Sequence, residues 1–146
     1  TDGPIRGKVA LQPIAYRPSD ELPDEDYPLL LSTGRTLYHY NAATQTRRAS
    51  GAMARQPGNF IEMHRKDARM RGLQDGQAVH VRSRRGTIVA KVQVSPRMRR
   101  GCVWMPLHFP ESNTNRLTND AGDPTTATAE YKVCAVKVEA IALGAK

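Results

Sequence analysis

The residues best suited to bind a ligand lie in one stretch, where an apolar run opens into a loop of polar and aromatic side chains. This loop follows three leucines and contains Thr33, Gly34, Arg35, His39, Tyr40 and Asn41. The side chains supply hydrogen-bond donors, acceptors and flat faces, and the glycine permits close approach of a ligand to the backbone. The combination suits a polar ligand with rings and phosphate groups. By itself it also fits an ordinary turn followed by a solvated arginine.

The elements around this loop predict how it is held. Residues 29–31 are consecutive leucines, which favours a short strand covered on both faces, although the same run fits one turn of a buried helix. Residues 32–34, Ser-Thr-Gly, are expected to end that strand. A second loop, residues 107–124, is rich in Asn, Thr, Asp and Pro. A loop of this length in a compact domain is more often functional, or ordered by a ligand, than accidental.

Short strands account for most of the remaining sequence. Residues 78–83 and 87–94 alternate apolar and polar side chains around an Arg-Arg-Gly turn, which is the pattern of a β-hairpin. A short amphipathic helix is expected over residues 64–71, closed by Gly72, and another helical turn within residues 51–58. Further strands are expected at residues 60–63, 102–106 and 131–138. About six or seven short strands with one or two short helices favour a mainly-β fold, a small closed or nearly closed barrel.

The first 26 residues lack the dense pattern of strands found in the rest of the chain and are predicted to lie outside the barrel. Residues 7–16 alternate loosely around Pro13, as a short edge strand would, and residues 17–28 are acidic and rich in proline, as in a surface linker. We therefore divide the chain into an N-terminal segment, residues 1–26, and a barrel domain, residues 27–146.

The charge of the chain narrows the classes of partner. Lys and Arg number 22 against 14 Asp and Glu, and the net charge of +8 predicts attraction to phosphates or to an acidic surface. Nucleic acid is one such partner, but the basic residues are scattered over several segments, and neither an RNA-binding aromatic motif nor zinc-finger spacing occurs. No secretory leader or long apolar run occurs either, so we expect a cytoplasmic protein without a membrane segment.

The cysteines and histidines predict no metal centre built by this chain alone. Cys102 and Cys134 lie far apart within apolar stretches, as reduced core thiols do. The four histidines have no zinc-site spacing with these cysteines. A protein-ligated metal is therefore not expected in this chain.

Four groups of residues, taken in order, form a set that resembles a known domain. They are Thr33-Gly34-Arg35 with His39, Thr44, Thr46 and Arg47-Arg48; Asp67-Ala68, Gly72-Leu73, Asp75-Gly76, Val79, Val81, Ser83 and Arg85-Gly86; Met105-Pro106 with Asn115, Leu117 and Thr118; and residues 131–138. The set resembles the C-terminal dinucleotide-binding domain of the molybdopterin oxidoreductase (dimethyl sulfoxide reductase) superfamily, which includes formate dehydrogenases and nitrate reductases. The resemblance covers residues 27–139, nearly the whole chain.

The resemblance implies a double-psi β-barrel-like domain that contacts two molybdopterin guanine dinucleotides, which together chelate one molybdenum or tungsten ion. By position, the cofactor-binding residues would be Thr33, Gly34, Arg35, Leu37, Tyr38, His39, Asn115, Tyr131 and Lys132. Leu107 and His108 would lie toward the substrate. Arg35 and Lys132 can offset the charge of phosphate or pterin oxygens, and Asn115 can pair with a polar pterin edge.

Two segments look closest to the catalytic (alpha) subunits of formate dehydrogenases. These are residues 38–42, Tyr-His-Tyr-Asn-Ala, and residues 108–111, His-Phe-Pro-Glu, ahead of Asn115. Nitrate reductases tend to carry Trp at position 40 and Gly-Thr-Met at positions 43–45, so a nitrate reductase is the alternative within the superfamily.

The resemblance also implies how the work is divided within the whole enzyme. That enzyme would oxidise formate, and its other domains would supply the metal ligand and an iron–sulfur cluster. This chain would be a cofactor clamp without a catalytic residue, inactive alone, with the remaining domains of the catalytic subunit and an electron-transfer subunit as partners. The competing class of function is a free-standing basic β-barrel that binds nucleic acid or another protein, whose affinity for oligonucleotides would fall with salt.

Overall fold

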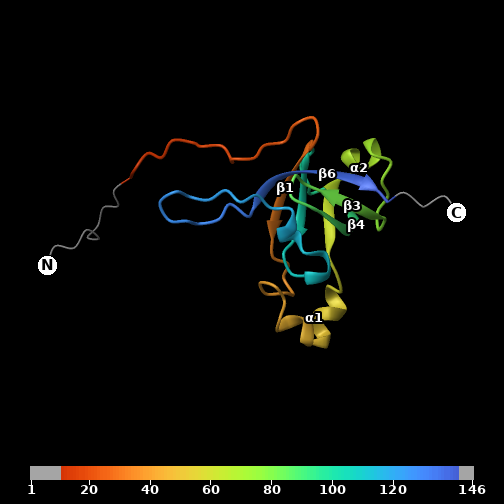
Figure 1. Ribbon diagram of the computed structural model, residues 1–146. Coiled ribbons are helices and arrows are strands. Elements are labelled where there is room, and N and C mark those ends of the chain that lie inside the picture. Colours follow the sequence, from red (N-terminus) through yellow and green to blue (C-terminus); the bar gives the residue numbers. More distant parts are fainter. Residues whose placement is uncertain (1–10, 142–146) are drawn as a thin grey trace.

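Alternation of apolar and polar side chains shapes the strands of this protein, because successive residues of a strand point to opposite faces of its sheet. The computed structural model describes residues 11–141 (Figure 1). Buried and accessible residues alternate along most of its strands, so that one face of each strand turns to a common core. The strands are β1 (Leu29–Gly34), β2 (Phe60–His64), β3 (Ala78–Arg82), β4 (Thr87–Ser95), β5 (Cys102–Pro106) and β6 (Val133–Ala140).

These strands close into a barrel in the order β1-β5-β2-β4-β3-β6. β1 pairs with β5 and β2 with β4 in parallel, whereas the remaining neighbours are antiparallel. The antiparallel pair of β3 and β4 is the hairpin that the sequence predicts. Closure pairs both edges of every strand, so the barrel leaves no free edge. The mainly-β, closed barrel expected from the sequence is confirmed.

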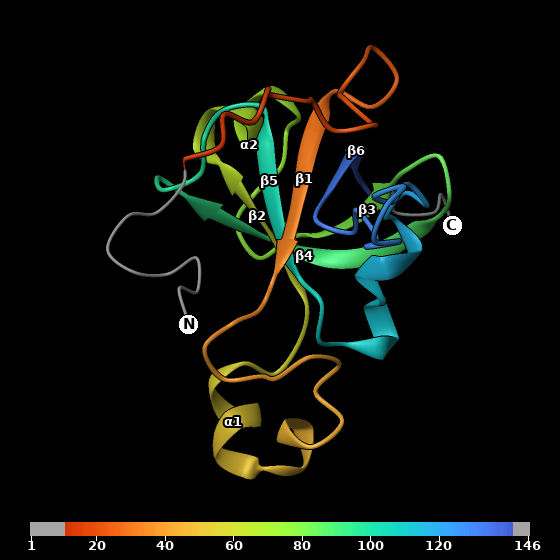
Figure 2. The ribbon, with the colours of Figure 1, turned by 90° about the vertical axis from the view of Figure 1, so that its left-hand side faces the viewer.

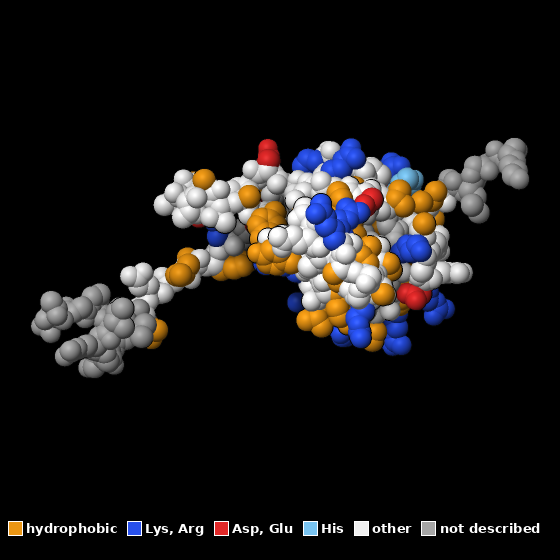
Figure 3. Space-filling model, turned by 90° about the horizontal axis from the view of Figure 1, so that it is seen from below, with side chains coloured by type: hydrophobic (Ala, Val, Ile, Leu, Met, Phe, Trp, Pro, Cys, Tyr) orange, Lys and Arg blue, Asp and Glu red, His pale blue; other side chains and the backbone are white. Residues whose placement is uncertain are grey.

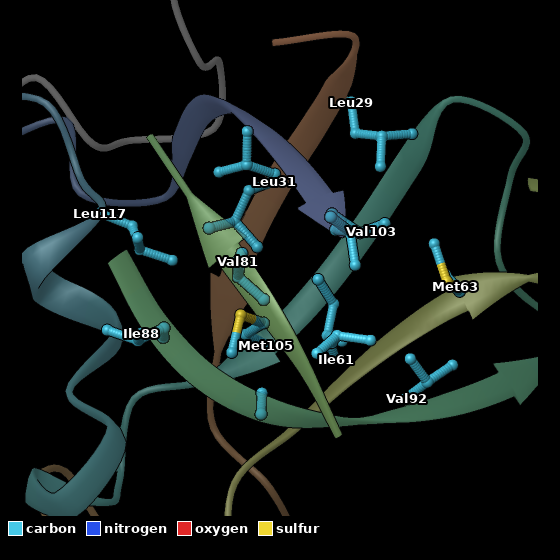
Figure 4. Close-up of a cluster of buried hydrophobic side chains, with 14 of the residues drawn as sticks. Leu29, Leu31, Ile61, Met63, Val81, Ile88, Val92, Val103, Met105 and Leu117 are labelled. Carbon is cyan, nitrogen blue, oxygen red and sulfur yellow. The ribbon is translucent and has the colours of Figure 1, made fainter. Parts of the chain in front are cut away.

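The core of the barrel consists of aliphatic and methionine side chains that point inward from all of the strands (Figure 4). Burial of each such side chain stabilises the fold by about 1.5–3 kcal/mol. Leu117, which comes from the loop after β5, is fully buried in the same cluster and so anchors that loop. The largest fully buried strand residues are Leu29, Leu31, Ile61, Met63 and Met105.

Two short α-helices flank the barrel, as the sequence predicts. α2 (Arg65–Met70) is followed by Gly72, whose φ of +64° is the left-handed conformation that favours glycine after a helix. α1 (Ser50–Arg55) follows a 3₁₀ turn, η1 (Thr46–Arg48), and lies beyond one end of the barrel (Figure 1). No helix within residues 11–141 has the length and apolar character needed to cross a membrane.

β1 differs from the strand expected from the sequence. Ser32 and Thr33 continue the strand to Gly34, because they pair in register with Trp104 and Met105 of β5. The expected break within Ser32-Thr33-Gly34 is therefore wrong, since pairing with a neighbouring strand overrides the local turn preference. Burial alternates along β1, so this strand is covered on one face and not on both.

The N-terminal segment adds no strand to the barrel within the described residues. Residues 11–16 are the described part of the expected edge strand, and the first part of that prediction lies outside the described residues. Residues 11–16 have no regular secondary structure, and Leu11, Ile14 and Tyr16 are exposed. The physical reason is that a closed barrel has no free edge with which this segment could pair.

The acidic stretch that follows is bound to the β3–β4 turn by ion pairs. Glu21 lies 2.7 Å from Arg84 and 2.6 Å from Arg85, and Asp24 also pairs with Arg84. The Arg84 guanidinium lies over the ring of Tyr27, 4.6 Å from its centroid. The Glu21 side chain is only 11% exposed, so its two arginine partners, in place of water, stabilise the negative charge of the carboxylate. The stretch that the sequence suggests is a solvated linker is thus attached to the barrel.

The long loop after β5 folds in two parts. Its first part holds two 3₁₀ turns, η2 (Pro110–Ser112) and η3 (Thr114–Arg116). Its second part, residues 120–130, extends away from the barrel as a hairpin-like excursion in which Gly122 bridges Ala129, and the chain returns to the barrel at Tyr131 (Figure 1). The first part contributes to the candidate site described next.

Candidate functional site

β1 and β5 run side by side in the same direction and deliver the loops that follow them to one end of the barrel (Figure 2). Gly34 lies opposite Pro106 in the register, and Gly34 O accepts a hydrogen bond from the Leu107 N–H at 3.0 Å. Residues 35–49, here named loop 1, and residues 107–118, named loop 2, therefore start next to each other.

A pocket of about 270 Å³ lies where loops 1 and 2 meet the segment that precedes β6. Four of its six lining residues, Arg35, Leu107, Asn115 and Tyr131, are positions that the family resemblance assigns to the cofactor or the substrate. The fold thus brings together residues from three segments that are far apart in the sequence. The complete lining is Arg35, Asn41, Ala42, Leu107, Asn115 and Tyr131.

The end of β1 holds the segment before β6 in place. The Thr33 hydroxyl donates a hydrogen bond to Tyr131 O at 2.8 Å, and the Thr33 N–H donates to Lys132 O at 3.2 Å. Thr33 is buried, so its side chain supports this segment from behind and does not line the pocket. The Lys132 ammonium lies 5.9 Å from the centroid of the Tyr131 ring, and both side chains are exposed. A cation and an aromatic face are therefore presented together.

Asn115 is presented by a turn that is fixed to the barrel on both sides. Before it, the buried Thr114 hydroxyl donates to Pro106 O at 2.8 Å. After it, the Arg85 guanidinium donates two hydrogen bonds to Leu117 O, at 2.9 and 3.2 Å. The Asn115 side chain is exposed and has no hydrogen-bond partner among residues 11–141. Its amide is thus free to pair with a ligand.

Arg35 carries a positive charge that no carboxylate of residues 11–141 offsets. Its Nε and Nη2 both donate to Asn41 Oδ1, at 3.0 and 2.6 Å. This neutral acceptor orients the guanidinium and leaves its charge unpaired beside the pocket. An oriented arginine suits a phosphate or another oxyanion.

Gly34 is required by packing within the barrel. A Cβ at this position would lie 2.9 Å from Nε1 of Trp104 on the neighbouring strand β5. The indole therefore covers the backbone at the point where β1 ends. The sequence suggests close approach of a ligand as the reason for this glycine, and the structure adds a second one, close approach of a tryptophan.

Leu37, Tyr38 and His39 do not line the pocket, although the resemblance assigns them to the cofactor as well. Leu37 is exposed, and Tyr38 is near the Arg55 guanidinium at 5.8 Å from the ring centroid. His39 is buried and donates through Nε2 to Gln56 O at 2.8 Å. Its role in this geometry is to close loop 1 onto the end of α1.

His108 is fully buried, and both of its ring nitrogens form hydrogen bonds. Its Nε2 accepts the Thr36 N–H at 2.7 Å, and its Nδ1 donates to Asn41 O at 2.5 Å. Burial lowers the pKa of His108 below its usual value, and the charges of His39 and Arg35 act in the same direction. The imidazole is therefore neutral, and it lies behind loop 1 and not in the pocket.

The end of the molecule that carries this pocket is basic, with apolar side chains between the charges (Figure 3). Arg48 and Arg55 are exposed on loop 1 and on α1. Arg47 pairs with Glu111 of η2, and that hydrogen bond lowers the pKa of the Glu111 carboxyl. The ion pair gives loops 1 and 2 a further connection.

Residue types alone named Asn41 among the ligand-binding side chains of the loop, but the positions assigned by the resemblance include neither Asn41 nor Ala42, although both line the pocket. The signal available in the sequence is the residue type, because Asn adopts left-handed backbone angles more readily than most residues and Asn41 has φ +46°. Arg85, whose guanidinium donates to Leu117 O, and Gly86, which lies close to Arg116 O, belong to the motif groups but were not assigned to the site. Their contacts join distant segments, and no local pattern reports such contacts.

Neither a metal cluster nor a disulfide is formed within residues 11–141. No group of three or more His, Cys, Asp or Glu residues in this part of the chain could hold a metal ion. Cys102 and Cys134 are free. Burial raises the pKa of the Cys134 thiol to about 11, and the nearby carboxylate of Glu21 adds to the shift. The groups at the pocket, a cation, an amide and an aromatic face, suit recognition of an anionic ligand with rings.

Comparison with known proteins agrees with this geometry. The sequence model of the family described as "Molydopterin dinucleotide binding domain" matches residues 29–135 of the chain. This chain belongs to that family. As a molybdopterin dinucleotide-binding domain, it carries the pocket described above inside the matched region.

Several relatives contain a similar domain. The domain is 48% identical over 129 residues to the "F420-dependent formate dehydrogenase 2 subunit alpha" of Methanococcus maripaludis, a match that covers 88% of this chain and 19% of the relative. It is 40% identical over 137 residues to a nitrate reductase of Symbiobacterium thermophilum, covering 91% of this chain and 18% of that one. The chain thus spans about a fifth of the length of the curated relatives it matches.

A solved structure supports the fold of this molybdopterin dinucleotide-binding domain. The acetylene hydratase of Pelobacter acetylenicus superposes with a TM-score of 0.68 at 17% identity, covering 79% of this chain and 18% of that chain. At this identity the likeness concerns the fold alone.

Proposed function

We propose that this domain is the cofactor clamp of a formate dehydrogenase-like oxidoreductase and binds bis(molybdopterin guanine dinucleotide) carrying molybdenum or tungsten. The observation that carries the proposal is the pocket shared by Arg35, Asn115 and Tyr131. Three separate segments of a domain from this family present an unpaired cation, a free amide and an aromatic ring at one place. This set fits the phosphates, polar pterin edges and rings of such a cofactor.

The residues would share the work in three ways. Arg35 and Lys132 would offset anionic oxygens, and Asn115 would pair with a polar edge beside Tyr131. Thr33, Gly34 and His39 would hold the frame behind these groups, through the contacts described above. Leu37 and Tyr38 would extend the contact surface on loop 1, and Leu107 would lie on the substrate side of the pocket. His108, which the resemblance also assigns to the substrate side, would instead hold loop 1 from behind, because it is buried outside the pocket.

When bound in the whole enzyme, the metal cofactor would accept the two electrons released as formate becomes carbon dioxide and a proton. This chain would bind and orient the cofactor, and none of its residues would take part in bond breaking. The other domains of the catalytic subunit would supply the metal ligand and an iron–sulfur cluster, and an electron-transfer subunit would accept the electrons. The short span of the chain relative to its relatives supports this division.

Formate is favoured over nitrate as the substrate of the whole enzyme. Identity is 48% to a formate dehydrogenase alpha subunit and 40% to a nitrate reductase, over similar lengths. A domain boundary close to residue 27 is supported by the start of the family match and of β1, both at residue 29. The cytoplasmic location expected from the sequence stays a prediction.

The test is amide chemical-shift mapping of the chain with guanosine diphosphate, which carries the guanine and pyrophosphate of the cofactor, and with a short DNA duplex as control. Shifts at Arg35, Asn115 and Lys132 with the nucleotide are expected. Arg35→Gln should weaken this binding by roughly 10- to 150-fold, since a charge-assisted hydrogen bond is worth roughly 1.5–3 kcal/mol. Arg99→Gln removes the same charge at an exposed position outside the pocket and is the matched control. An equal loss of nucleotide affinity in both variants would contradict the proposal. Amide chemical-shift changes that occur only with DNA and only at residues 82–100 would contradict it as well.

A further inference from the structure

A chain of hydrogen bonds runs from the buried core of the site to the guanidinium at the pocket. Its middle member is Asn41, a non-glycine residue in the left-handed conformation, with φ +46°. The Asn41 side chain accepts from both Arg35 nitrogens, at 3.0 and 2.6 Å. The Asn41 carbonyl accepts from His108 Nδ1 at 2.5 Å. One residue therefore joins the charge at the pocket to a histidine in the interior.

The contacts of His108 determine which tautomer it adopts. A backbone N–H can only donate, so Nε2 must accept the Thr36 N–H at 2.7 Å. The proton of the neutral ring is then on Nδ1, where it donates to Asn41 O. His108 thus forms hydrogen bonds to loop 1 at residues 36 and 41, on either side of the turn that carries the exposed Leu37 and Tyr40. Because His108 belongs to loop 2, it couples the two loops.

We propose that His108 is a positioning residue, which aims the Arg35 guanidinium at the phosphates of the bound dinucleotide by fixing Asn41 in its left-handed conformation. This inference rests on the proposed function for the identity of the ligand, but not for the hydrogen-bonded chain itself. Left-handed backbone angles are unfavourable for a residue with a Cβ, even for Asn, which adopts them more readily than most, so a neighbour that holds them makes the conformation persist. The bond from His108 to the Asn41 carbonyl supplies that restraint.

The bond from Thr36 to His108 forms only while the ring is neutral. A second proton on His108 would turn Nε2 into a donor facing the Thr36 N–H, and the bond would be lost. The other charged or titratable groups that face this ring are His39, whose ring centroid lies 5.6 Å away, and Arg35. Both disfavour added positive charge at His108. Protonation at acidic pH is therefore expected to release Thr36, whereas the Nδ1–H can still donate to Asn41 O and hold Arg35 through Asn41.

The direct readout of this orientation is the Arg35 Nε–H resonance in the full chain, without ligand. In the wild type the hydrogen bond to Asn41 Oδ1 should protect this proton from exchange with water. Asn41→Gly should abolish the protection, because glycine keeps the left-handed backbone but has no side-chain acceptor. Ala127→Gly is the matched control, since Ala127 is also left-handed, at φ +55°, but lies in the hairpin-like excursion, outside the pocket lining.

Two replacements of His108 separate positioning from packing. In His108→Asn the amide nitrogen can take the place of Nδ1 and donate to Asn41 O, so the Arg35 resonance should stay protected. In His108→Leu this donor is absent and the protection should be lost. If His108→Leu does not fold, His108→Phe makes the same test, because phenylalanine keeps a flat ring but has no donor for Asn41 O. A folded Asn41→Gly or His108→Leu chain that keeps the wild-type Arg35 resonance would overturn the proposal.

Binding of guanosine diphosphate provides the second measurement. Loss of a preorganised side chain costs about 0.5–1.5 kcal/mol, so Asn41→Gly should bind roughly two- to tenfold more weakly than the wild type and Ala127→Gly should not change. Equal affinities of Asn41→Gly and the wild type would overturn the role of this chain of bonds in binding. If the wild type binds no nucleotide, the proposed function fails, and the Arg35 resonance still tests the positioning role.

Discussion

Replacement of Gly86 by alanine should displace the turn that presents Asn115. Gly86 lies in the β3–β4 turn, and an added Cβ would approach Arg116 O to 2.9 Å. This oxygen belongs to the backbone of η3 and cannot rotate away as a side chain could. The neighbouring residue Leu117 is fully buried, so η3 cannot simply lift from the barrel either. The strain is therefore expected to fall on both the stability of the barrel and the geometry of loop 2.

The magnitude follows from the cost of overpacking. Forcing an additional methyl group into a packed contact costs about 1–3 kcal/mol. For a chain of this length each kcal/mol lowers the midpoint of thermal unfolding by roughly 3–4 °C, which gives a decrease of about 3–12 °C for Gly86→Ala. The matched control is Gly58→Ala, because nothing lies within 4 Å of a Cβ built at Gly58. That control should be neutral or gain about 0.4–1 kcal/mol from the stiffer unfolded chain.

The assay combines thermal and urea unfolding with amide shifts of the two variants. Gly86→Ala should unfold at lower temperature and shift the amides of residues 113–118, whereas Gly58→Ala should leave these amides unchanged. A Gly86→Ala chain with wild-type stability and wild-type shifts in loop 2 would refute the argument that this turn fixes Asn115.

Three further outcomes follow from the buried polar groups. The pKa of His108 is lowered in the folded state, so near and below pH 6.5, the ordinary histidine value, the unfolded state binds more protons than the folded state. The free energy of unfolding should therefore fall as the pH drops through that value. Urea titrations at several pH values should show a weaker pH dependence for His108→Gln. Thr33→Val keeps the shape of the side chain but leaves Tyr131 O without its donor. The free energy of unfolding in urea should fall by about 1 kcal/mol, and the amide chemical shift of Tyr131 should change. A thiol reagent at pH 8 should modify the half-buried Cys102 before Cys134, whose thiol is buried with a pKa of about 11; faster labelling of Cys134 in mass spectrometry would contradict its burial.

Local sequence patterns predicted much of the fold. The alternation in β3 and β4 and the turn between them predicted the hairpin, because the side chains of a strand alternate between two faces without reference to distant residues. The glycine after α2 was equally readable, since its left-handed angle is a local requirement. The order of the motif groups pointed to the family, which the match over residues 29–135 confirms.

The sequence by itself determined the strands, the type of barrel, the family and several of the residues that line the pocket. Only the tertiary structure decided that β1 continues to Gly34, that no strand forms over residues 11–16, and that His108 faces the interior. It also decided that Arg35, Asn41 and Asn115 share one pocket. The reason is that strand pairing, closure of the barrel and burial depend on contacts between distant segments. Residue type and spacing specify which groups are available, and the packing of the barrel determines which of them meet.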